Sequence, residues 1–308
     1  MKKAIAFIAM FALIAGFILS CQKAEGPKER RELTEAEKAR CKELWEGRPD
    51  KDYTKDEARY LREVCRIPWA KEPEELVDVM RWWRDEDDHW EMMYYHINRI
   101  MRLRQTWKPE VIEALKRIAL ESEYVQLRER ATIALHEIGG RKYLPLIKEV
   151  LRREVEERGV TPESRKTVIY WAGRILSEEG EYEYAFPYLM KAKVFRISSK
   201  RKDRRAVPYA MKALKDKDEG IRLDAAGVLI RAGGVEDREK AFEALVDILE
   251  NSKDGGYVDQ AIYWLGELGD ERAVPVLKKS LSRFDPEKDF RYDSVLKALK
   301  KIKERKKK

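Results

Sequence analysis

The stretch AIYWLGELGDERAVPVL, from Ala261 to Leu277, repeats a string that occurs earlier in the chain. Residues 262–266 read IYWLG, and residues 169–173 read IYWAG. In the later copy, apolar residues recur at i, i+3, i+4 and i+7 and stop before Gly269, which is typical of a buried helix face that ends at a glycine. Pro275 then opens a second apolar run, where a proline in the first helical turn loses no hydrogen bond. We therefore predict a helical hairpin that occurs more than once.

The same apolar stripe begins at four places, and a second apolar run follows each of them. The stripes begin at Ala131, Val168, Ala225 and Ala261. Three of the second runs start with a proline, and the fourth, Glu239–Leu249, has none; the prolines are Pro145, Pro187 and Pro275. Helical hairpins repeated every ~30–47 residues are the signature of an α-solenoid.

The interval between the second and third stripes is longer than the other two by roughly twenty residues. It contains a further proline-started run, Ala206–Leu214, without a full first helix before it. We therefore place an insertion at Val194–Arg205.

Three of these segments resemble HEAT-like repeats of the phycobilisome-lyase type. They are RERATIALHEIGG (Arg128–Gly140), RLDAAGVLIRAGG (Arg222–Gly234) and WLGELGDERAVPVL (Trp264–Leu277). The resemblance implies an all-α fold, a right-handed α-solenoid of HEAT-like helical hairpins, which we expect over residues 85–286. Within it, Trp171 and Trp264 hold equivalent positions, and we expect them to pack between repeats and not to form an aromatic ligand site.

The N-terminus, MKKAIAFIAMFALIAGFILSC, has two lysines before an uncharged run, Ala4–Leu19, that is shorter than the ~20 residues of a spanning helix. This pattern is typical of a secretory signal. Ile18–Cys21 resembles the bacterial lipobox, which implies cleavage before Cys21 and attachment of lipid to its thiol. We expect a signal peptide at 1–20, a lipidated tether at 21–33 and a place in the cell envelope, where Gln22 favours the outer membrane. The alternative is an uncleaved short anchor.

Export changes how the two remaining cysteines are interpreted. Cys41 and Cys65 lie in two helix-like stretches on either side of a turn at residues 47–50, within an N-terminal helical region at 34–84. An even number of cysteines in an oxidising compartment favours a disulfide, which would staple this hairpin. The alternative is two buried thiols.

No catalytic or metal-binding motif emerges from the sequence. His89 and His96 share a helix face near several acidic residues, but their spacing matches no metal motif, and acids favour a helix start in any case. The single pair His136-Glu137 cannot build the di-iron site of the HEAT-like deoxyhypusine hydroxylase. Bilin lyases share the repeat type but handle a cytoplasmic pigment. We expect no enzyme, no catalytic residue, no metal and no cofactor, and a bilin-lyase-like enzyme remains the least favoured alternative.

Positive charge concentrates in two places. Arg196–Arg205 has six basic residues against one acidic, and Lys297–Lys308, within a capping helix and basic tail at 287–308, has eight against one. Export argues against nucleic acid, so the candidate partners are anionic lipid or an acidic envelope polymer. The candidate anion-binding residues are Arg196, Lys200, Arg201, Lys202, Arg204, Arg205, Lys306 and Lys307. The alternative is a solvated loop and a frayed tail.

In solenoids of this type the second helices usually line the concave face. Two tyrosines directly follow prolines, and lysines lie four positions after prolines, which gives Tyr188, Lys191, Tyr209, Lys212 and Lys279 as candidate partner-binding residues. We therefore expect a non-catalytic envelope lipoprotein that binds a protein partner on this face, with docking of the basic loop and tail on an anionic surface as the alternative.

Overall fold

The computed structural model describes residues 33–45, 54–65, 90–103 and 108–305. The expected signal peptide, Cys21, His89, Lys306 and Lys307 lie outside the described residues. The chain divides into two units, residues 1–69 and residues 70–308. The described residues of both are helices, turns and connections, with no strand among them.

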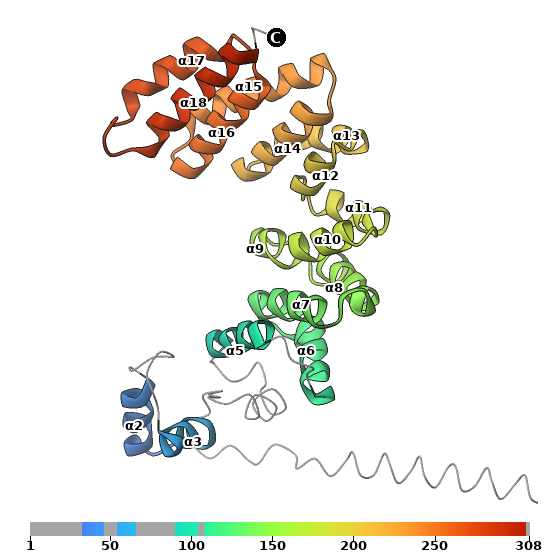
Figure 1. Cartoon of the computed structure of the whole chain (residues 1–308), viewed down its shortest axis with the longest axis vertical. Coiled ribbons are helices and arrows are strands. Elements are labelled where there is room, and N and C mark those ends of the chain that lie inside the picture. Colours follow the sequence, from blue (N-terminus) through green and yellow to red (C-terminus); the bar gives the residue numbers. More distant parts are fainter. Residues whose placement is uncertain (1–32, 46–53, 66–89, 104–107, 306–308) are drawn as a thin grey trace, which may run out of the picture. The chain divides into compact units, whose positions relative to one another are not determined.

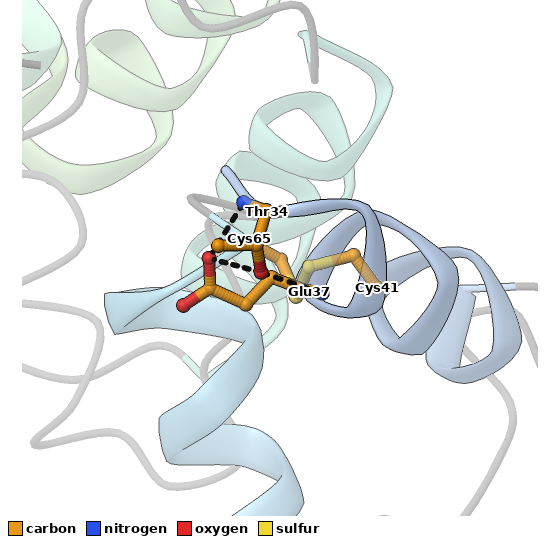
Figure 2. The surroundings of a disulfide bond; sticks show 4 residues. All are labelled: Thr34, Glu37, Cys41 and Cys65. Carbon is orange, nitrogen blue, oxygen red and sulfur yellow. Dashed lines mark hydrogen bonds between the residues drawn. A yellow bond between two sulfur atoms is a disulfide. The ribbon is translucent and has the colours of Figure 1, made fainter. Parts of the chain in front are cut away.

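The first unit contains helices α2 (Glu35–Trp45) and α3 (Lys55–Glu63). Each begins at a threonine that exchanges hydrogen bonds with a glutamate three residues later, so the free amides of the first turn are satisfied. Cys41 and Cys65 form a disulfide with their Cα atoms 5.5 Å apart, which confirms the predicted pairing (Figure 2). The bond ties α2 to the residues that follow α3.

The second unit is a solenoid of helix pairs stacked in two rows (Figure 1). Each first helix contacts the next first helix along the chain, and most second helices contact the next second helix. The first row consists of α5 (Trp90–Leu103), α7 (Val125–Gly139), α10 (Val168–Glu178), α12 (Arg196–Arg201), α14 (Glu219–Ala232), α16 (Gly255–Leu268) and α18 (Phe290–Arg305). The second row consists of α6 (Pro109–Glu121), α8 (Leu144–Glu156), α11 (Tyr182–Lys191), α13 (Val207–Ala213), α15 (Val235–Asn251) and α17 (Ala273–Ser280).

Short elements complete the unit. The five-residue helix α9 (Pro162–Lys166) precedes α10, and 3₁₀ turns lie before α8, before α13 and after α17; these are η1 (Gly140–Tyr143), η2 (Arg204–Ala206) and η3 (Leu281–Arg283). The last helix, α18, packs on α16 and α17, where a capping helix was expected. In the part of the chain that the structure describes, no helix has the length and apolar character needed to cross a bilayer.

The turn residues follow the predicted chemistry with two differences. Gly269 ends α16 in the left-handed region, with φ of 73°, as expected. Gly233 ends α14 in an extended conformation. Pro187 was expected to start a helix and lies inside α11, because that helix already begins at Tyr182, whose buried side chain packs into the core.

The predicted apolar stripes form the core. Most of their residues in α7, α14 and α16 are fully buried, whereas Ile138 and Leu268 at the helix ends are half-buried; the fully buried residues include Ala131, Ala134, Leu135, Ala225, Val228, Leu229, Ala261 and Leu265. Trp264 is half-buried and packs against Gly227 of the neighbouring first helix, which confirms the predicted packing role for this indole. Trp171 also packs against the core, with the Arg174 guanidinium over its ring.

The contact between Gly227 and Trp264 predicts that the effect of Gly227→Ala on the free energy of unfolding changes sign when the indole is removed. A β-carbon at Gly227 would lie 2.6 Å from the indole, so Gly227→Ala should destabilise the chain by about 1–3 kcal/mol of overpacking, offset in part by the ~1 kcal/mol better helix propensity of alanine. In a Trp264→Ala background the clash is gone, and the same change should stabilise by up to ~1 kcal/mol. Urea denaturation of the four proteins measures this, and equal effects in both backgrounds would refute the packing role.

An arginine near the start of two first helices contacts its second helix and the preceding turn, closely in one repeat and more loosely in the other. Arg128 of α7 donates from Nε and Nη2 to both oxygens of Glu154 on α8, at 2.5 and 3.0 Å, and from Nη1 to the carbonyl of Ser122. Arg222 of α14 donates to the carbonyl of Asp216 and lies 3.7 Å from Asp247 of α15. The arginine of the repeat signature therefore joins a first helix to its second helix and to the preceding turn.

Candidate functional site

The structure brings four of the five predicted partner-binding residues onto adjacent second helices. Tyr188 and Lys191 lie on α11, and Tyr209 and Lys212 lie on α13. The ring of Tyr209 meets that of Phe186 on α11, with centroids 6.3 Å apart. We call Tyr188, Lys191, Tyr209 and Lys212 the tyrosine face. The fifth residue, Lys279, lies apart on α17 and pairs with Glu250 of α15 at 3.2 Å.

The charged side chains of α8, the second-row helix before α11, are paired with neighbours. Glu149 on α8 accepts hydrogen bonds from Arg152 and Arg153, and these bonds lower the pKa of its carboxyl to about 2. By contrast, Lys191 and Lys212 are exposed and have no ion pair with any residue that the structure describes. Tyr209 is 47% exposed. Uncommitted charge and aromatic surface therefore coincide on the tyrosine face.

The basic segment expected as a loop is helical in its first half. Residues 196–201 form α12, which packs between α10 and α14. Ser199 donates to the carbonyl of Gly227, and the buried Ser198 accepts a hydrogen bond from Tyr182. The segment is thus a six-residue first helix that precedes α13. Its buried residues include the small polar Ser198 and Ser199, so its sequence shows no apolar stripe that would predict a helix.

Arg205, one of the predicted anion-binding residues, makes structural contacts with the preceding repeat. Arg205 donates to Glu183 and Asp203, and its guanidinium lies over the ring of Phe186. Arg272, which precedes α17 two helix pairs further along the chain, makes the same set of contacts with Glu239, Asp270 and Phe242. Arg205 is therefore a recurring structural clamp.

The other members of the predicted set differ in their surroundings. Arg201 lies over the ring of Tyr182 at 4.4 Å, and Arg196 lies near Asp224. Three further residues are exposed and have no ion pair among the described residues; these are Lys200, Lys202 and Arg204.

A cavity of about 310 Å³ opens in the first row, beside the short helix α12. Its walls come from α9 and the starts of α10, α12, α14 and α16, at the end where α12 lacks the extra turns of its neighbours. We call this cavity the notch. The side chains that line it include Lys166, Tyr170, Arg196, Ile221, Asp224 and Tyr257.

Most charges around the notch are balanced by neighbours. Arg165 donates to the carbonyl of Ala192 and to Asp218, both at 3.1 Å. Lys193, which also lines the cavity, donates to Asp216. Lys166 is exposed and has no ion pair within the described ranges.

Asp224 is the unusual group of the notch. Burial raises the pKa of its carboxyl to about 6, against the opposing effect of Arg196, whose Nε lies 3.8 Å away. That separation is too long for a hydrogen bond. The fold therefore keeps an incompletely paired carboxyl in the wall of a cavity.

Because the folded chain binds the Asp224 proton more tightly than the unfolded chain does, this group costs stability as pH rises from about 4 to about 6. Asp224→Asn carries no charge and should be more stable than the wild type at pH 7.5 by ~1–2 kcal/mol, a reduced figure because the side chain stays 28% exposed. At pH 4 the difference should vanish. Urea denaturation at both pH values measures this, and a pH-independent difference would contradict it.

Histidines do not assemble a metal centre in the described part of the chain. His136 lies 3.0 Å from Glu179, which also accepts a hydrogen bond from Arg141. His96 is buried in α5. Among the described residues, no three or more histidine, cysteine, aspartate or glutamate side chains are placed together to hold a metal ion.

Comparison with known proteins identifies the repeat. Residues 259–283, which include most of α16 and all of α17, match the family described as PBS lyase HEAT-like repeat. No curated protein matches the chain. One chain in the structure of the complex of CpcE and CpcF of phycocyanin lyase from Nostoc sp. PCC7120 is similar at 15% identity. The similarity covers 76% of this chain and 96% of the Nostoc chain, with a TM-score of 0.35.

A computationally designed self-assembling cyclic homo-oligomer is similar at 18% identity, over 89% of this chain and 91% of that chain, with a TM-score of 0.14. Neither likeness bears on function. The match at residues 259–283 and the stacked helix pairs together show an all-α solenoid with HEAT-like repeats.

Proposed function

We propose that this protein is a non-catalytic binding scaffold of the bacterial cell envelope, held there by lipid on Cys21, that binds a protein partner through the tyrosine face. The observation that carries the proposal is the coincidence of an exposed tyrosine, Tyr209, with two lysines, Lys191 and Lys212, that lack ion pairs in the described structure. The charges of α8 are paired, and the cations on α15 and α17 without an ion pair to a described residue, Arg238 and Lys278, have no exposed aromatic side chain on their helices.

The physical argument concerns what a partner would gain at this surface. Tyrosine supplies a large contact area with little loss of side-chain freedom, which is why it is enriched at interfaces and in their energetic centres. The rings of Phe186 and Tyr209 already hold each other in an edge-on contact, so Tyr209 is partly ordered before binding. Lysines without a neighbouring acid are available to pair with acidic residues of a partner.

The test compares two tyrosines of equal exposure on different rows. Tyr209→Ala and Lys212→Glu should each reduce recovery of the partner with the purified, crosslinked full chain by about tenfold, whereas Tyr263→Ala, on α16 of the first row and 50% exposed, should not. Circular dichroism of each variant controls for folding. Undiminished recovery with both tyrosine-face variants would reject the proposed face.

Docking of the basic segment on an anionic surface draws less support. Arg205 pairs with Asp203 and with Glu183 of the preceding repeat, and Arg201 lies over the ring of Tyr182 in that repeat, so their removal would disturb packing as well as charge. The exposed remainder within the segment consists of Lys200, Lys202 and Arg204, together with Arg196, whose guanidinium lies near Asp224.

A further inference from the structure

The notch is a built feature of the fold. Other first helices around it have between 11 and 14 residues, whereas α12 has six. The chain that a longer helix would use forms instead the turn at residues 192–195, which contains Lys193 in the left-handed region with φ of 58°. The ends of α10, α14 and α16 therefore remain uncovered beside α12.

A second cavity of about 220 Å³ adjoins the notch. The two share Arg196, Asp224 and Gln260, and the second adds Lys200 and Arg231, neither of which has an ion pair in the described structure. Arg196 thus lies where the two cavities meet. Cations outnumber acids along the combined lining, so an anionic ligand is favoured there.

The lining also offers apolar surface. Tyr170 and Tyr257 contribute aromatic rings, and Ile221 contributes an aliphatic side chain. The guanidinium of Arg196 lies 5.9 Å from the centre of the Tyr170 ring, which holds this cation at the edge of the aromatic wall. A cavity near 300 Å³ with mostly apolar walls and a few polar groups has the form of a small-ligand site.

We propose that the notch binds a carboxylate attached to an apolar or aromatic group. The carboxylate lies between Lys166 and Arg196, and the apolar group lies on Tyr170, Ile221 and Tyr257. This chemistry occurs both in small organic acids and at the C-terminal residue of a peptide chain. The site lies on the first row of helices, so it is independent of the tyrosine face.

Asp224 makes this binding depend on pH. The charged groups that face it are Arg196 of α12, Asp218 of its own helix, and Arg165 and Lys166 of α9. When its carboxyl is protonated, it no longer repels the ligand carboxylate and is able to donate a hydrogen bond to it. Binding is therefore tighter at pH 5 than at pH 7.5.

The experiment titrates the purified full chain by calorimetry with 3-phenylpropionate and with its uncharged amide. The acid should bind at least tenfold more tightly than the amide. The double variant Lys166→Gln/Arg196→Gln should weaken binding of the acid at least tenfold, whereas the matched pair Arg238→Gln/Lys278→Gln, exposed on α15 and α17 of the second row, should leave it within twofold. Asp224→Asn should bind the acid within about twofold at pH 5 and pH 7.5, the small difference arising from partial protonation of the ligand at pH 5, a result that a folding defect would not produce.

A third probe, N-acetylglycylphenylalanine, separates the two sources of the carboxylate. Tighter binding of this peptide than of 3-phenylpropionate assigns the notch to a protein C-terminus, and equal or weaker binding assigns it to a small acid. Absence of binding by both acids, or equal binding of acid and amide, would overturn the proposal and would leave the partner-recovery result at the tyrosine face unaffected.

Discussion

Replacement of Arg128 by methionine is expected to lower the free energy of unfolding by about 3–5 kcal/mol. The Arg128 side chain is 6% exposed and that of Glu154 is fully buried, so the substitution leaves a carboxylate in the core without its bidentate partner. It also leaves the carbonyls of Ser122 and Glu123 without this donor. Arg158, 3.4 Å from the same carboxylate, compensates only in part because it is more exposed.

Two controls distinguish this effect from a general loss of charge. Arg152→Ala removes a comparably dense set of ion pairs at the surface of the same repeat and should cost less than ~1 kcal/mol. The double variant Arg128→Met/Glu154→Leu removes both buried charges and should regain most of the lost stability. Urea denaturation measures all three, and a cost below 1 kcal/mol for Arg128→Met would show that the pair does not hold α7 to α8.

Removal of the disulfide should cost the first unit about 3 kcal/mol, the value for a loop of this length. The bond closes a loop between residues 24 positions apart. Without the bond, the unfolded hairpin regains the conformational entropy that the closed loop removes, which favours unfolding. Cys41→Ser/Cys65→Ser should therefore lose amide-exchange protection in α2 and α3 while α14 and α16 keep theirs. Reductant should reproduce the effect in the wild type and change nothing in the variant. Unaltered exchange in α2 and α3 would contradict the stapling role.

The repeats were predictable because their physical cause is local. An apolar stripe such as Ala225, Val228 and Leu229 specifies one helix face whatever surrounds it, and a glycine such as Gly269 ends the helix by its own conformational freedom. The cysteine pairing was predictable from the number of cysteines and the expected export, since only two candidates remained once Cys21 was assigned to lipidation.

The candidate sites were less predictable because they depend on contacts between repeats. The basic residues at 196–205 look alike in sequence. In the structure, Arg205 pairs with Glu183 and lies over the Phe186 ring, whereas Lys200 has no ion pair with a described residue. The notch was missed although its signal, the missing first helix at Val194–Arg205, was noticed. The sequence does not show that α9 and the starts of α14 and α16 converge there, or that Asp224 lies half-buried beside them.

The central claim is that the second-row tyrosine face binds a protein partner, and site-specific photo-crosslinking tests it most directly. A benzophenone amino acid is placed at position 209 or at position 263 of the full chain, and intact cells that produce each variant are irradiated. The account predicts one discrete protein adduct from position 209, lost when Lys212→Glu is added and absent from position 263. No adduct at position 209, or the same adducts from both positions whatever residue stands at 212, would contradict it.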